Sequence, residues 1–263
     1  MRPLGPGREV APGVRVLAHL HRSNRLDVYD AWCERRAARV VLKTPRPDHL
    51  NDSRTIRALL REGRLLKRLS HPNLVRAYAV HPSPRPAVVL ETLGGETLEH
   101  IARRRRIAAG QIAVAGVQLA SALRYLHAEG MLHLDVKPSN AIADGAAAKL
   151  IDLSIARPPG RVPAGRGTWC NMAPEQVRGG VVAPAADVWG LGTVLFEMAT
   201  GESPFTGDDE HEYPQLHRRA EPVRTLRRLP RPLADAIDAS LEPAPGHRPT
   251  PDELIDALLP LAA

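Results

Sequence analysis

The sequence predicts an α+β protein with two lobes: a small lobe with a five-stranded antiparallel sheet and one main helix, and a larger, mainly helical lobe. Two observations support this fold class. Short β-branched runs separated by turn residues fill the first ninety residues, whereas helical spacing of apolar residues dominates the rest of the chain. The pair Gly94–Gly95 lies where the pattern changes. We therefore expect a sheet lobe over residues 1–93, a helical lobe over 94–263, and a small-ligand site between them.

Five apolar runs predict the strands of the first lobe, because they combine β-branched residues with partial apolar–polar alternation. These runs are residues 13–20, 26–32, 38–44, 74–80 and 87–92. Between the third and fourth runs, residues 52–70 repeat leucine at near-helical spacing and stop at a His-Pro-Asn breaker. This segment predicts the main helix of the sheet lobe.

Four longer segments predict the principal helices of the second lobe, with Gly- and Pro-rich connections between them. These segments are residues 110–130, 187–201, 231–241 and 250–262. The segment 187–201 is apolar on most sides, so we expect it to be buried. No internal repeat is visible.

The composition is typical of a folded protein with a core built from small aliphatic residues. Hydrophobic residues make up 43% of the 263 residues, but aromatic residues only 3%. No apolar run approaches the roughly 20 residues that cross a bilayer, and the first ten residues lack the apolar stretch of a signal peptide. Cys33 and Cys170 are too far apart in the sequence to suggest a disulfide framework or a metal site. We expect a cytoplasmic protein with no membrane contact.

The chain is basic, with a formal charge of +7 and a pI of about 10.0, which raises the alternative of a nucleic-acid partner. However, the basic residues are scattered. The one dense run, Arg103–Arg106, lies in an expected helix with few aromatic residues nearby, so we interpret it as a solvated helix face and expect no nucleic-acid partner. Only four of the 36 basic residues are lysine, which suggests that Lys43 and Lys137 are needed as compact point charges.

The stretch HLDVKPSN, residues 133–140, places an acid, a lysine and an amide close together after an apolar run. Phosphoryl transfer requires an acid that orients the attacking hydroxyl, a lysine that holds phosphate, and metal ions that neutralise charge. The stretch resembles the catalytic loop of serine/threonine protein kinases of the eukaryotic-like (Hanks) type found in bacteria. The resemblance extends over about residues 14–259, so a protein-kinase-like bilobal fold is expected.

The resemblance implies a role for each polar residue of the catalytic loop. Asp135 would orient or accept the proton of the substrate hydroxyl, and Lys137 would contact the γ-phosphate of ATP. Asn140 would coordinate Mg²⁺ together with Asp152 of the segment KLIDLS, since Mg²⁺ prefers oxygen ligands. The implied cofactors are ATP and Mg²⁺, with Mn²⁺ possible. The implied partner is a protein substrate with a Ser or Thr acceptor, with a regulatory partner protein as a further possibility.

The resemblance also implies nucleotide-binding residues in and near the sheet lobe. Lys43, at the end of the run VVLK, would hold the phosphates, with Glu62 of the following helix as its ion-pair partner. Glu91 and Leu93 would offer backbone groups to the adenine, Leu90 would line the back of the adenine pocket, and Glu96 would reach the ribose. Two further residues expected in the ATP site are Leu20 and Val28.

Four residues of the second lobe resemble positions that support the catalytic loop. Thr168 would brace the catalytic acid and lysine. Glu175, in GTWCNMAPEQ, would form a buried ion pair with Arg248 of GHRPT, and Asp187 of ADVWGLG would hold the backbone of the catalytic loop. For these residues we expect a supporting role.

The sequence departs from the family pattern in the loop that covers the phosphates. His21, Ser23 and Leu26 occupy the places of three glycines, which elsewhere allow close approach of backbone N–H groups and positive φ angles. Arg22 and Arg25 would compensate in part through their charge. We therefore expect ATP binding weaker than is usual in the family.

Leu134 replaces an arginine that in many kinases pairs with a phosphate on the activation loop. From residue 153 to 172 the only hydroxyl side chains are Ser154 and Thr168. We therefore expect activity that does not depend on phosphorylation of this loop.

Two alternatives to an active serine/threonine protein kinase remain open. The lost glycines favour a pseudokinase that binds partners, or nucleotide weakly, without turnover, whereas the complete set of polar groups argues against it. A small-molecule phosphotransferase would also carry an acid loop and a metal-binding Asp, but the Glu175–Arg248 pattern is typical of protein kinases.

Overall fold

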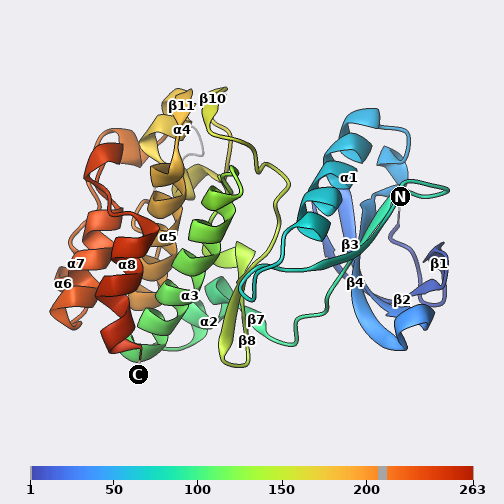
Figure 1. The fold of residues 1–263 in the computed structure, drawn as a ribbon, viewed down its shortest axis with the longest axis horizontal. Coiled ribbons are helices and arrows are strands. Elements are labelled where there is room, and N and C mark those ends of the chain that lie inside the picture. The colour runs from blue at the N-terminus through green and yellow to red at the C-terminus, as the bar shows by residue number, and fades with distance from the viewer. Residues whose placement is uncertain (1, 207–211, 263) are drawn as a thin grey trace. The chain divides into compact units, whose positions relative to one another are not determined.

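The computed structural model describes residues 2–206 and 212–262, which form two compact units (Figure 1). The first unit comprises the chain up to residue 70 together with 75–94 and 152–154. The second comprises 71–74, 95–151 and the chain from 155 onward. The principal break lies between Gly94 and Gly95, one residue beyond the expected boundary, and the short segments 71–74 and 152–154 each belong to a different unit from the chain around them.

The first unit is built on a six-stranded antiparallel sheet, one strand more than expected. Its strands, in spatial order, are β1 (Glu9–Ala11), β2 (Val14–Arg22), β3 (Leu26–Cys33), β4 (Ala38–Pro45), β6 (Ala87–Leu90) and β5 (Ala77–His81). The additional strand, β1, is short and pairs with the start of β2. One face of the sheet carries a core of Val, Ala and Leu side chains around the fully buried Tyr29.

Helix α1 (Ser53–Arg68) packs against the sheet of the first unit. Asp52 caps its first turn, since the side chain accepts a hydrogen bond from the N–H of Arg54. Gly63 faces the sheet so closely that a Cβ there would lie 2.5 Å from Val88 Cγ2. Val88 is the register partner of Lys43, and directly opposed residues share a face of a sheet. The helix therefore covers the face that bears Lys43.

The β2–β3 hairpin contains His21, Ser23 and Leu26, which stand in the places of three glycines of the family pattern. Ser23 closes its turn by donating its N–H to the carbonyl of Leu26 at 2.9 Å. Among the described non-glycine residues, positive φ angles occur only at Ala37, Leu134 and Asp152. The hairpin therefore uses backbone conformations that any residue adopts, so the expected need for glycine φ angles does not arise here.

Arg22, expected to offer its charge to a nucleotide, is held by Asp27 within the hairpin. The guanidinium donates from Nε to Oδ1 at 2.7 Å and from Nη2 to Oδ2 at 2.9 Å. His19 Nε2 and the Tyr29 hydroxyl each lie 3.1 Å from the same carboxylate, which is fully buried. Burial alone would raise the pKa of Asp27, but these hydrogen bonds outweigh it and lower the pKa.

The second unit is organised around α5 (Pro184–Thr200), which is buried along nearly its whole length as expected. Helices α2 (Leu98–Arg104), α3 (Ala109–Ala128), α6 (Val223–Leu226) and α7 (Arg231–Ser240) pack against it. Two short helices, α4 (Pro174–Arg178) and α8 (Pro251–Leu258), complete the helical part. Within the described segments, no helix has both the length and the apolar character that a bilayer crossing needs.

Two small sheets in the second unit were not expected from the sequence. One contains β7 (Glu96–Thr97), β8 (Ala141–Asp144) and β9 (Ala147–Leu150), and the other pairs β10 (Gly160–Val162) with β11 (Gly180–Val182). Half of the residues of β8 and of β9 are alanine, a residue depleted in strands, so composition did not reveal them. The hairpin of β8 and β9 begins directly after Asn140 and ends shortly before Asp152.

We predict that Asp27→Asn lowers the free energy of unfolding by about 1–3 kcal/mol at pH 7, because Arg22 loses its charged acceptor. The pKa of Asp27 is lower in the folded state than its ordinary value of 3.8. Its contribution is therefore complete above that value and disappears as the pH falls through the folded-state pKa. Urea unfolding of both proteins between pH 7 and pH 3 measures this convergence.

The exposed Asp235 on α7 provides the control, since Asp235→Asn should change stability by less than about 0.5 kcal/mol at any of these pH values. A loss for Asp27→Asn that stays the same from pH 7 to pH 3 would show that the charge of Asp27 contributes nothing.

Candidate active site

The first unit brings Lys43, Glu62 and Asp152 together. Lys43 Nζ on β4 lies 2.9 and 3.1 Å from the two carboxylate oxygens of Glu62 on α1. It also lies 3.2 Å from Oδ2 of Asp152. Lys43 and Glu62 are both buried, so this charge-assisted network is largely withdrawn from water.

The pKa shifts in this group follow from two carboxylates that share one ammonium. Burial would lower the pKa of Lys43, but Glu62 and Asp152 outweigh it and raise the pKa above its ordinary value. Burial would raise the pKa of Asp152, but Lys43 and the hydrogen bonds of Ser154 hold it below its usual range. Burial raises the pKa of Glu62 to about 7 against the attraction of Lys43. Lys43 is therefore cationic and Asp152 anionic at neutral pH.

Asp152 is held in a backbone conformation that non-glycine residues seldom adopt, with a φ of 66°. Its Oδ1 accepts the N–H of Ser154 at 3.0 Å, and Arg61 Nη2 on α1 donates to the carbonyl of Ser154 at 2.8 Å. These bonds hold the segment 152–154 so that an ionised carboxylate is presented. A carboxylate oxygen retains a second lone pair after one hydrogen bond, so Asp152 fits a divalent cation.

The second unit brings together Asp135, Lys137, Asn140 and Thr168. The Thr168 hydroxyl donates to Asp135 Oδ1 at 2.6 Å and accepts from Lys137 Nζ at 2.6 Å. Lys137 Nζ also lies 3.1 Å from Asp135 Oδ2. Asn140 Nδ2 donates to the backbone carbonyl of Asp135 at 3.0 Å and to its Oδ2 at 2.9 Å. Both carboxylate oxygens of Asp135 are therefore fixed in orientation.

Asn140 has an amide oxygen suited to a cation. Its nitrogen makes both of the hydrogen bonds to Asp135, and Oδ1 accepts none from the described residues. An amide oxygen is an acceptable ligand for Mg²⁺. Asn140 lies on a single 3₁₀ turn, Pro138–Asn140, that begins directly after Lys137. The residues expected to hold a metal therefore have the donor chemistry that the metal requires.

Asp187, in the first turn of α5, holds the backbone ahead of Asp135. Its oxygens accept the N–H of His133 at 2.9 Å and that of Leu134 at 2.7 Å. Leu134 has a φ of 65°, a conformation that costs a bulky residue about 1–3 kcal/mol. Gln176 Nε2 donates to the carbonyl of Leu134 at 2.9 Å. The strained residue is therefore held on both of its peptide groups.

Three supporting residues were missed by the sequence reasoning: Gln176, His127 and Arg61. Gln176 also donates to the carbonyl of Arg166 at 3.2 Å, so it links the segment that contains Arg166 to the loop that contains Leu134 and Asp135. His127 Nε2 lies 2.8 Å from Asp187 Oδ2. Nothing in the spacing of residues around Gln176 predicts its role. The role becomes visible only in the structure, where the side chain is buried.

Glu175 and Arg248 form a bidentate ion pair in the second unit. Arg248 Nη1 lies 2.7 Å from Oε1 and Nη2 lies 2.9 Å from Oε2. The Arg248 side chain is fully buried, and it also donates to backbone carbonyls that include those of Glu242 and Ala185. A buried guanidinium with this many acceptors supports the fold.

The other expected nucleotide-binding residues occupy varied environments. Val28 is the register partner of Lys43, so it lies on the same face of the sheet, and Leu90 on β6 is buried. Leu20 is 56% exposed.

The segment after β6 limits what the expected backbone contacts can be. The Glu91 N–H donates to the carbonyl of Arg76 at 2.9 Å, so this N–H is already engaged within the first unit. Leu93 is half-buried. Glu96 lies in the second unit, exposed, with Oε2 3.4 Å from His100 Nε2 and 3.7 Å from Arg104 Nη1.

The chain is similar to known proteins over most of its length. The family described as "Protein kinase domain" matches residues 25–258. Serine/threonine-protein kinase PkaA of Streptomyces coelicolor is 33% identical over 230 residues, which cover 83% of this chain and 42% of PkaA. Serine/threonine-protein kinase PknB of Mycolicibacterium smegmatis is 35% identical over 203 residues, covering 72% of this chain and 32% of PknB.

A third relative, the probable serine/threonine-protein kinase PkwA of Thermomonospora curvata, is 31% identical over 226 residues, covering 83% of this chain and 30% of PkwA. The chain thus spans less than half the length of these relatives. The family match includes both groups of polar residues described above, the one around Lys43 and the one around Asp135. The chain belongs to the protein kinase family, and its relatives are serine/threonine kinases of bacteria.

Proposed function

We propose that this chain is an active protein kinase that transfers the γ-phosphoryl group of ATP, bound with Mg²⁺ or Mn²⁺, to Ser or Thr hydroxyls of a protein substrate. The observation that supports this most is the arrangement around Asp135. Its two oxygens are oriented by Thr168, Lys137 and Asn140, yet its side chain keeps 15% of its surface exposed. A fixed, accessible carboxylate is what orientation of a substrate hydroxyl requires.

In this mechanism Asp135 accepts a hydrogen bond from the substrate hydroxyl and draws the proton away as the oxygen attacks phosphorus. Lys137 places a positive charge beside that carboxylate and would stabilise charge on the transferred phosphoryl group. Lys43 would hold the phosphates of ATP. When bound, a divalent cation neutralises phosphate charge, and Asp152 and Asn140 are the residues that would hold it.

We predict that Asp135→Asn lowers the rate of phosphoryl transfer by about 100-fold or more, because an amide cannot accept the proton. Transfer of labelled phosphate from ATP to a generic basic protein, with Mg²⁺ or Mn²⁺, measures the rate. Asp235→Asn, an equivalent change on the exposed face of α7, should leave it unchanged. Absence of transfer by the unmodified protein, together with specific capture of a partner, would support a pseudokinase instead.

We predict that phosphatase treatment changes the rate by less than about twofold, because Leu134 offers no cation to a phosphate. The Leu134 side chain is buried, and the Thr168 hydroxyl is occupied by Asp135 and Lys137. Thr168→Ser keeps this hydroxyl, whereas Thr168→Val should lower the rate about tenfold or more. A large loss after phosphatase treatment, with the phosphate mapped to Ser154 or Thr168, would refute independence from phosphorylation.

We predict that Mg²⁺–ATP binds several-fold more weakly than it binds the kinase domain of PkaA when both are measured by calorimetry. The β2–β3 hairpin carries side chains at residues 21, 23 and 26, and its Arg22 is engaged by Asp27. Side chains keep backbone N–H groups from the close approach that phosphates need. Equal or tighter binding by this chain would contradict the prediction.

A further inference from the structure

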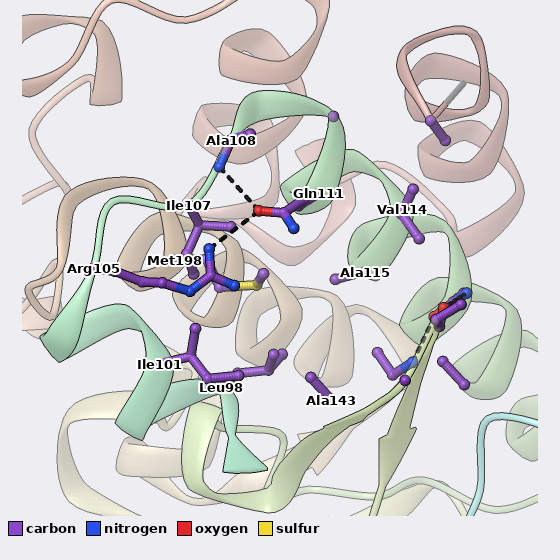
Figure 2. Close-up of a pocket in the computed structure, with 17 residues that line it drawn as sticks. Leu98, Ile101, Arg105, Ile107, Ala108, Gln111, Val114, Ala115, Ala143 and Met198 are labelled. Carbon is purple, nitrogen blue, oxygen red and sulfur yellow. Dashed lines mark hydrogen bonds between the residues drawn. The ribbon is translucent and has the colours of Figure 1, made fainter. Parts of the chain in front are cut away.

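Three hollows in the surface of the second unit adjoin one another at Arg105. The first has a volume of about 490 Å³ and is mostly apolar, with Leu98, Ile101, Val114 and Met198 among its lining residues (Figure 2). Alanines of β8 and β9 also line it, and their small side chains leave the space open. Among the described residues that line it, Arg105 alone is charged.

The two other hollows are basic. One, of about 550 Å³, is lined by the run Arg103–Arg106 and by Arg227, against a single carboxylate, Glu202. The other, of about 440 Å³, is lined by Glu96, Ile101, Arg104 and Arg105. We call the three together the Arg105 groove, since Arg105 lines all of them. The groove has an apolar end and a basic end.

Part of the positive charge in the Arg105 groove has no carboxylate partner among the described residues. The Arg105 guanidinium donates from Nη1 to the amide oxygen of Gln111 at 3.3 Å (Figure 2) and forms no ion pair within the described part of the chain. Arg106 makes no hydrogen bond or ion pair with the residues that the structure describes. By contrast, Arg103 lies 2.9 Å from Glu99 and Arg104 lies 3.7 Å from Glu96. Arg105 and Arg106 are therefore the cations that an incoming anion would meet.

Arg227 adds a third cation at the basic end. Its Nη atoms donate to the carbonyls of Ala199, at 2.8 Å, and Ile107, at 2.5 Å, while its Nε is buried and has no partner among the described residues. Burial and the nearby charge of Arg106 lower the pKa of Arg227. Two guanidinium groups that line one hollow repel each other, and a bound anion would relieve that repulsion.

The shape and chemistry of the groove favour a polypeptide as its occupant. Together the three hollows exceed the about 1,000 Å³ that small-molecule sites reach. No described residue that lines them is aromatic, so bases of a nucleic acid would find nothing to stack on. The apolar surface is recessed, whereas attachment to a membrane requires apolar side chains that project into the lipid.

We propose that the Arg105 groove binds an extended segment of a partner protein in which a short apolar stretch adjoins a run of acidic residues. The apolar side chains enter the hollow between α2, α3 and the β8–β9 hairpin. The acidic side chains reach Arg105 and Arg106. This inference does not depend on phosphoryl transfer and concerns recruitment of a partner.

Fluorescence anisotropy tests the proposal with a labelled nine-residue peptide in which three leucines spaced by serine are followed by four glutamates. We expect saturable binding to the whole chain, and binding at least tenfold weaker when the leucines become alanine or the glutamates become lysine. The reverse order of the two halves is measured in parallel, since the groove can be followed in either direction.

Two variants locate the binding site. Arg105→Glu/Arg106→Glu should weaken binding at least tenfold. Arg57→Glu/Arg64→Glu makes the same change of charge on exposed positions of α1 and should alter binding less than twofold. Ala147→Leu adds volume in the apolar hollow without changing charge and should also weaken binding. Thermal melting of each variant confirms that it is folded.

Three results would overturn the proposal. The first is no saturable binding of either peptide order below 1 mM. The second is an equal loss in the two double variants, which would indicate attraction by net charge alone. The third is binding of RNA or anionic vesicles that requires Arg105 and Arg106 while the peptides do not bind.

Discussion

Asp187 accepts hydrogen bonds from two backbone N–H groups, those of His133 and Leu134. The arrangement of the polar residues around Asp135 depends on these two bonds. Leu134 holds a left-handed conformation immediately before Asp135, and this conformation is unfavourable for leucine. Asp187 offsets that cost because its carboxylate is buried in the first turn of α5, where the helix dipole also favours negative charge. The orientation of Asp135 is thus a consequence of where α5 begins.

The position of α5 depends in turn on two glycines within the helix, Gly190 and Gly192. A Cβ on Gly190 would lie 2.8 Å from the carbonyl oxygen of Val136, and a Cβ on Gly192 would lie 2.7 Å from Cβ of Ser240. These glycines allow α5 to approach the catalytic loop on one side and α7 on another. Close packing in the interior therefore sets the geometry of the partly buried polar group around Asp135.

The sequence predicted most elements of the fold, and its failures have identifiable physical causes. Long periodic segments such as 187–201 were identified because their apolar residues repeat along the chain. β1 escaped because three residues carry too little pattern, and β8 and β9 because alanine is a poor strand former. The places of the hairpin glycines are taken by other residues, yet the chain closes the turn through Ser23 with ordinary φ angles. The hairpin therefore differs from the family pattern in its side chains.

The site residues divide in the same way. Asp135, Lys137 and Asn140 lie within six residues of one another, so their association could be inferred from the loop itself. Gln176 and His127 act through contacts with residues 42 and 60 positions away, Leu134 and Asp187, and such contacts leave no local signature in one sequence.

The geometry at two positions explains why lysine is used there in a chain whose basic residues are mostly arginine. Lys43 Nζ meets both oxygens of Glu62 and one oxygen of Asp152 from a single nitrogen, with three donors that point in different directions. Lys137 Nζ likewise serves Thr168 and Asp135 at once. A planar guanidinium would spread these bonds over three nitrogens and fill the space between the acceptors. In a chain that otherwise prefers arginine, Lys43 and Lys137 therefore stand where several acceptors converge on one point.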